Sequence, residues 1–110
     1  MTQEEFIKTC DEQYRRRMLI MNDEKKARDM DDRLMPFKRM ASLQQKTPHE
    51  VCINLCTKHF IDLIDITQGR KIVDDNYAHE LISDVQNYLD ILNALMLEDS
   101  LERGREFSHE

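Results

Sequence analysis

The sequence predicts an all-α protein, a three- to four-helix bundle built on a C-terminal antiparallel helical hairpin. Two observations carry this prediction. Apolar residues recur every three to four positions along most of the chain, which is the spacing of one face of an α-helix. The 110 residues include only two glycines and two prolines, so few positions interrupt the helices, and nothing in the pattern is typical of a strand.

Two helices are expected in the first part of the chain. The first covers residues 2–22, where Thr2 and Glu5 have the spacing of a capping box, in which each side chain satisfies a free backbone donor of the other residue. Residues 23–32 are almost all charged, and we interpret them as a frayed extension or mobile loop. The second helix is expected over residues 34–46, because Pro36 suits the first turn of a helix.

The last two predicted helices form the hairpin. Thr47 can cap the third helix, Pro48 suits its first position, and Gly69 favours the left-handed conformation that ends it. The fourth helix begins at Asp74 or Asp75 and is expected to stop at Gly104. The apolar stripe of the third helix contains Cys52, Leu55, Cys56, His59, Leu63 and Ile66, and that of the fourth contains Ala78, Leu81, Ile82, Val85, Tyr88, Leu89, Leu92, Leu95 and Met96. We therefore expect one helical domain over residues 1–103 and a disordered tail over residues 104–110.

Charge is unevenly distributed along the chain. Residues 1–46 carry eleven Lys/Arg against nine Asp/Glu, a net charge of +2, whereas residues 47–110 carry five against thirteen, a net charge of −8. An acidic C-terminal part argues against binding of duplex nucleic acid, which needs a basic surface. It leaves open cation binding, a basic protein partner, or plain solubility.

Cysteine content and hydropathy indicate the compartment. Three cysteines, an odd number, do not form a disulfide framework and are typical of a reducing environment. The acidic N-terminus has no apolar run behind it, unlike a signal peptide, and no segment approaches the roughly 18 to 20 apolar residues of a membrane span. We expect a cytoplasmic protein, and a homodimer, since a core this small gains burial by self-association.

Carboxylates of the hairpin form a candidate metal site. In an antiparallel pair around a turn near residue 71, facing positions have numbers that add to about 143. Asp62 and Asp65 then share a face of one helix, and Glu80 and Asp84 share a face of the other. At one edge of the hairpin these four carboxylates could hold Mg²⁺, which prefers oxygen ligands. The alternative is that they are solvated edge residues, with Lys58 and Asp62 as an ion pair.

Other polar residues lie near this edge. Lys58, His59 and Asn87 are candidate ligand-binding residues, although a single His in an apolar stripe is more often a satisfied core residue. Cys52, Cys56 and His59 are spaced along one helix face, but zinc sites rarely take three ligands from one continuous helix. We interpret the two cysteines as core thiols.

Four short motifs are similar to patterns in small helical proteins of bacteriophages. They are Arg33-Leu34-Met35-Pro36-Phe37-Lys38-Arg39-Met40-Ala41, Thr47-Pro48, Lys58-His59 and Asp84-Val85-Gln86-Asn87-Tyr88-Leu89. The chain resembles the nucleotide-modification-associated domain family and, more remotely, the MazG-like nucleoside triphosphate pyrophosphohydrolases. This resemblance implies acidic pairs on two antiparallel helices that hold Mg²⁺ and activate a water on a triphosphate. The corresponding positions are Asp62, Asp65, Glu80 and Asp84. The third helix has no glutamate after Glu50, unlike those enzymes.

Two functions follow, and the sequence does not decide whether the chain is an enzyme. The first is a phage-type, MazG-like protein that binds or hydrolyses nucleotides or is associated with nucleotide metabolism, in the cytoplasm of the host cell. The second is a non-catalytic acidic interaction protein that inhibits a host defence or replication component, of the anti-CRISPR or nucleic-acid-mimic type. The first implies a nucleotide ligand, and the second a host protein partner with a basic surface.

Overall fold

The computed structural model describes residues 1–21 and 32–107. In these ranges the chain forms four α-helices, α1 (Gln3–Met21), α3 (Met35–Gln44), α4 (Pro48–Thr67) and α5 (Asp75–Phe107), and no strand. The predicted all-α helical bundle is confirmed. Residues 22–31, which hold most of the predicted charged extension, and residues 108–110 of the predicted tail lie outside the described ranges.

The chain divides into two compact units, residues 1–33 and residues 34–110. The first unit contains α1, and its predicted capping box is confirmed. The backbone N–H of Glu5 donates to Thr2 Oγ1 at 3.1 Å, and the backbone N–H of Thr2 donates to Glu5 Oε2 at 3.2 Å. No residue of α1 is buried. The predicted single domain over residues 1–103 stays a prediction.

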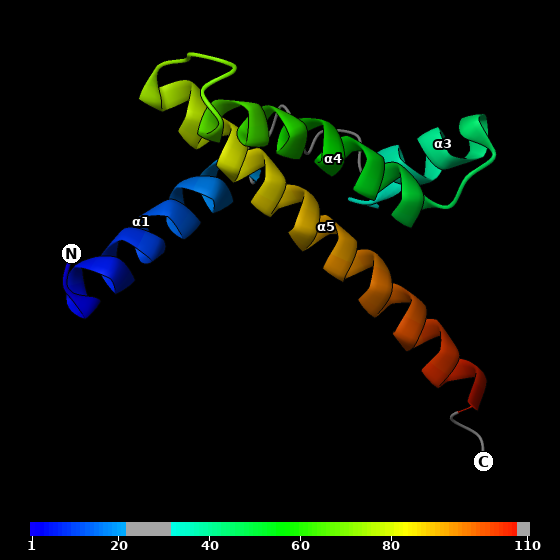
Figure 1. Cartoon of the computed structure of the whole chain (residues 1–110). Helices are drawn as coiled ribbons and strands as arrows, with labels where there is room; N and C mark the ends of the chain where they lie inside the picture. Colours follow the sequence, from blue (N-terminus) through cyan, green and yellow to red (C-terminus); the bar gives the residue numbers. More distant parts are fainter. Residues whose placement is uncertain (22–31, 108–110) are drawn as a thin grey trace. The chain divides into compact units, whose positions relative to one another are not determined.

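In the second unit, α4 and α5 form the antiparallel hairpin (Figure 1). Thr47 caps α4 by accepting the backbone N–H of Glu50 at 3.1 Å, and Gly69 follows the helix with φ of 73°. Asp74 caps α5, since its Oδ1 accepts the backbone N–H of Tyr77 at 2.8 Å. Each of these helix ends agrees with the sequence prediction.

The C-terminal end of α5 differs from the prediction. We expected Gly104 to stop the helix, but α5 continues through Gly104 to Phe107. A glycine inside a solvated helix costs only about 1 kcal/mol relative to alanine, so a helix that is already long can continue through it. The expectation of a tail that begins at residue 104 is therefore wrong for residues 104–107.

Contacts between the helices fix the register of the hairpin. Side chains of α4 meet α5 at three pairs of positions, which are Cys52 with Tyr88, Cys56 with Val85, and His59 with Asp84. Their residue numbers add to between 140 and 143, close to the sum of about 143 that an antiparallel pair with this turn predicts.

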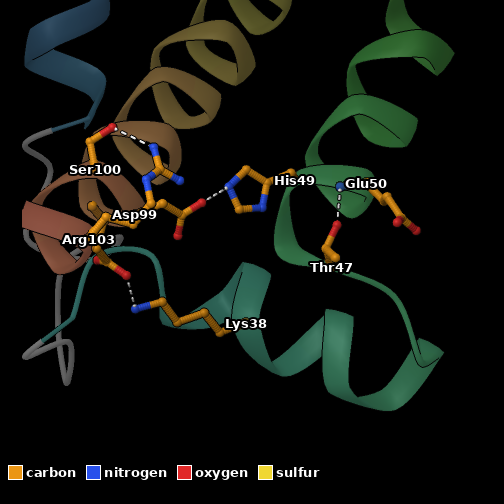
Figure 2. Close-up of polar contacts among 8 residues, drawn as sticks. Lys38, Thr47, His49, Glu50, Asp99, Ser100 and Arg103 are labelled. Atoms are coloured by element: carbon orange, nitrogen blue, oxygen red, sulfur yellow. Dashed lines mark hydrogen bonds and ion pairs between the residues drawn. The ribbon is translucent and has the colours of Figure 1, made fainter. Parts of the chain in front are cut away.

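The core lies where α3 packs on the first half of α4. Its buried residues are Leu34, Phe37, Ala41, Val51, Cys52 and Leu95. Two polar contacts, a Lys–Glu ion pair and a His–Asp contact, link the helices at this end of the hairpin (Figure 2). Lys38 of α3 lies 2.8 Å from Glu98 of α5, and His49 of α4 lies 2.8 Å from Asp99 of α5. We call this the open end of the hairpin, and residues 68–74 its loop end.

None of the four described helices combines the length and the apolar character that a crossing of the lipid bilayer requires.

Candidate functional site

Three of the four predicted carboxylates, those of Asp62, Asp65 and Asp84, each lie near a different basic side chain. Asp84 Oδ2 lies 3.9 Å from His59 Nδ1, a contact between two predicted site residues. The other two contacts come from the loop. Asp62 Oδ1 lies 3.5 Å from Lys71 Nζ, and Asp65 Oδ1 lies 3.8 Å from an Nη atom of Arg70.

The described part of the chain contains no group of three or more His, Cys, Asp or Glu side chains placed to hold a metal ion. Asp62, Asp65 and Asp84 are half-buried and Glu80 is exposed. The geometry therefore gives the predicted magnesium site no support. The donors are of the right kind for Mg²⁺, but too few of them converge, because a stable site needs several oxygens around one point.

His59 belongs to a small aromatic stack at the centre of the hairpin. Its ring lies 5.5 Å from the ring of Tyr88 with an interplanar angle of 27°, and Tyr88 meets the edge of Phe37 at 6.5 Å. Burial raises the pKa of Tyr88, and the nearby carboxylate of Asp84 raises that pKa further. His59 thus fills a packing position in the hairpin, as a half-buried member of the apolar stripe.

Lys58 and Asn87 lie on different helices of the hairpin, α4 and α5. Lys58 is exposed and lines a hollow of about 320 Å³ between α3 and α4, together with Met40, Val51 and Leu55. Asn87 is half-buried on α5. A ligand-binding role for Lys58, His59 and Asn87 stays a prediction.

The two cysteines of α4 differ in burial. Cys52 is fully buried, and its thiol donates to the backbone oxygen of Tyr88 at 3.1 Å. Burial raises the pKa of the Cys52 thiol. Cys56, one turn later, is half-buried with its Sγ 4.0 Å from the backbone oxygen of Val85. The interpretation of Cys52 as a core thiol agrees with this burial.

A broad apolar face on the hairpin is the feature that sequence reasoning missed. Six large apolar side chains lie on it between 40% and 54% exposed, and they are Ile53, Phe60 and Ile64 of α4 with Ile82, Leu89 and Met96 of α5. We call this set the uncovered face. We predicted Ile82, Leu89 and Met96 as part of one wide apolar stripe, but only Leu81 and Leu95 of that stripe are buried.

Helical spacing places the uncovered face opposite α3. At about 100° per residue, Phe60 lies roughly 180° around α4 from Val51, which packs against α3, and Ile53 lies roughly 160° from it. The same rule puts both stripes on one side of the antiparallel pair. An independent observation agrees at the open end, where Ile53, Leu92 and Met96 line one hollow of about 350 Å³ together with the polar residues Lys46, His49, Glu50 and Asn54.

The signal for this face was present in the sequence. Ile53, Phe60 and Ile64 recur at helical spacing outside the predicted stripe of their helix, and Ile82, Leu89 and Met96 recur every seven residues. The spacing alone does not say which side another helix covers.

A comparison with protein-family models, with curated proteins and with solved structures found no match to this chain.

Proposed function

We propose that this chain is a non-catalytic interaction protein that binds another protein through the uncovered face of the α4–α5 hairpin. One observation carries the proposal, which is the set of six large apolar side chains that no other helix of the second unit, residues 34–110, covers. They leave on the order of 500 Å² of apolar surface open to water, comparable to the largest apolar patch on a typical monomer, and such patches mark interaction sites.

The polar residues of the hairpin support a binding role over a catalytic one. The predicted carboxylates have Lys71, Arg70 and His59 as neighbours instead of one another. Hydrolysis of a nucleoside triphosphate needs converging groups that hold the phosphates and activate a water. The MazG-like function with Mg²⁺ therefore rests on the resemblance of short motifs alone.

The acidic side of the hairpin gives the proposed function a second component. Glu80 and Asp84 lie on the side of α5 away from the uncovered face, by the same helical spacing. A basic surface on a host defence or replication component would complement this side, as in the predicted inhibitor or nucleic-acid mimic. Affinity would come chiefly from apolar burial, whereas the charges would set partner choice and association rate.

Two neighbouring residues of α4 provide a matched test. Phe60 and Ile61 are each 52% exposed, but Phe60 lies on the uncovered face and Ile61 lies about 100° around α4 from Phe60, outside the six-residue set. Phe60→Arg and Ile61→Arg, used as baits in an extract of the source cells, introduce the same charge at the same exposure. We expect the wild type and Ile61→Arg to retain the same protein partners and Phe60→Arg to lose them, by quantitative mass spectrometry.

Two outcomes contradict this proposal. The first is an identical set of retained proteins for the two variants. The second is Mg²⁺-dependent release of pyrophosphate or phosphate from any of the (d)NTPs by the purified wild type, abolished by Asp84→Ala. That second outcome would favour the nucleotide function.

A further inference from the structure

We propose that the partner on the uncovered face is a second copy of this chain, docked face to face so that the two hairpins form a four-helix layer. This inference rests on the proposed function, because it names the protein that the face binds. It specifies an isologous dimer, in which the same six side chains contribute from both copies.

The shape of the face suits another hairpin. The stripes of α4 and α5 each lie roughly 100° around their helix from the contact between the two helices, so both project from the same side as parallel ridges. The seven-residue spacing of Ile82, Leu89 and Met96 is that of helices packed side by side in bundles. A layer with two such ridges can pack against another layer of the same shape, which a second copy provides.

The area of the face is adequate for a stable dimer. The six side chains expose on the order of 500 Å² of apolar surface to water, and a standard interface buries about 800 Å² on each partner. Half-buried residues between the ridges add to the contact area, and they are Cys56, Leu63, Val85 and Leu92. A face-to-face dimer therefore obtains most of the usual area from the hairpin alone.

Charge also favours self-docking on this side. The α4 positions that point toward the face between residues 53 and 64 are occupied by Ile, Cys, Thr, Phe and Leu, and the α5 positions between residues 78 and 96 by Ala, Ile, Val, Gln, Leu, Asn and Met. Two chains of net charge −6 repel each other, and a charge at the centre of their contact would be costly to bury. The face excludes such charges from its centre.

The hollow at the open end has a role in this arrangement. Ile53, Leu92 and Met96 line a space of about 350 Å³, large enough for a projecting apolar side chain of a partner. Phe60 and Leu89 lie near the middle of the face. A two-fold axis that passes near them, in the plane of the contact and at right angles to the helices, would bring the loop end of one copy over the open end of the other. Ile64 and Ile82 of the second copy are then the side chains nearest the hollow.

Sedimentation equilibrium of the purified full-length chain tests the inference. Leu89, on the face, is 50% exposed, and Leu101 is 55% exposed on the same helix, 120° further around. We expect the wild type and Leu101→Arg to form dimers of equal affinity. Leu89→Arg should raise the dissociation constant at least about 100-fold, since it places two like charges in an apolar contact.

Two further measurements keep the test decisive. Circular dichroism checks that Leu89→Arg retains the helix content of the wild type, as expected for a half-exposed position. The pair Phe60→Arg and Ile61→Arg repeats the comparison on α4, with loss of the dimer expected only for Phe60→Arg.

A wild type that stays monomeric up to about 200 µM overturns the inference, since a face filled by another part of the same chain or reserved for another protein leaves the chain monomeric. Equal dissociation constants for Leu89→Arg and Leu101→Arg overturn it as well. Failure of this inference can be distinguished from failure of the proposed function. If the purified chain is monomeric but the Ile61→Arg bait retains a protein that the Phe60→Arg bait loses, the face binds a different partner and only the second-copy inference falls.

Discussion

The two faces of the α4–α5 hairpin differ in what lies against them. Val51 of α4 packs toward α3 and is 2% exposed, whereas Phe60, nine residues later on the other side, is 52% exposed. The helix that covers one face, α3, has only ten residues, and residues 34–110 provide no second helix for the other face. The difference indicates that a unit this small has enough chain to bury one side of its hairpin and not both.

The largest effect that separates the faces is on stability. Leu95 and Met96 are neighbours on α5, 2% and 54% exposed. Leu95→Ala should lower the free energy of unfolding by about 2–5 kcal/mol, because it opens a cavity in the core. Met96→Ala should lower it by less than about 1 kcal/mol. Urea unfolding measures both, in the Leu89→Arg background so that self-association does not contribute. Equal losses would mean that the faces do not differ in packing.

The two cysteines of α4 extend the comparison to chemical reactivity. Cys52 is buried at the contact with α5 and its thiol has a raised pKa, so both access and thiolate content are low. Cys56 is half-buried toward the uncovered face. Mass spectrometry after iodoacetamide treatment should show Cys52 alkylated on the order of 100-fold more slowly than Cys56 in the monomeric Leu89→Arg chain. Similar rates would contradict the burial of Cys52.

The raised pKa of Cys52 also gives a pH dependence with a definite sign. Its ordinary value is 9.0, and burial makes ionisation harder in the folded chain than in the unfolded chain. Stability is therefore fully present below pH 9 and falls as the pH rises above it, since only the unfolded chain readily loses the proton. Cys52→Ser, which does not ionise in this range, should show a smaller fall in the same urea titrations.

The salt dependence of binding distinguishes a second copy of the chain from a basic partner, because the two affinities should change in opposite directions. The expected change is smaller than those above. Self-association through an uncharged apolar face is opposed by the net charge of −6 on each copy. Raising NaCl from about 50 mM to about 500 mM should tighten the dimer about three-fold, because salt screens this repulsion. A complex between the acidic side and a basic partner should weaken instead. Sedimentation equilibrium at the two salt concentrations decides between these directions.

The loop end provides the smallest effect and a control that belongs to neither face. Lys71 Nζ lies 3.5 Å from Tyr77 Oη and 5.2 Å from the centre of the Tyr77 ring. This hydrogen bond is the main cause of the raised pKa of Lys71. Tyr77→Phe should lower that pKa toward 10.5, by NMR titration, and lower Tm by less than about 2 °C. The contribution of protonated Lys71 to stability is present below pH 10.5 and is lost as the pH rises beyond it. An unchanged pKa would contradict this contact.

Local chemistry made most of the fold predictable from the sequence. The helix starts at Thr2, Thr47 and Asp74 each depend on a side chain and a backbone donor three residues later, and the structure has all three contacts. The facing register follows from the length of the loop between two helices. The prediction that the helix ends at Gly104 was wrong because one glycine destabilises a helix only slightly and no second helix-terminating residue accompanies it.

The candidate site was harder to predict because it depends on elements outside the helices. Helical spacing predicted the carboxylates at one edge but did not place Arg70 and Lys71 of the loop, which lie against Asp65 and Asp62. The wide stripe of α5 was also visible in the sequence. Which half of it is covered depends on how many helices are available and on the ten-residue length of α3.

The most direct test of the account is to measure which side chains of the wild-type chain become protected as its concentration rises. Hydroxyl-radical footprinting reports the reactivity of Phe60, Leu89 and Met96 on the uncovered face and of Ile61 and Leu101 away from it, in one sample. We predict that reactivity falls for the first three with increasing concentration and stays constant for the other two. Equal protection of both groups, or constant reactivity of Phe60, Leu89 and Met96, would contradict a second copy on this face.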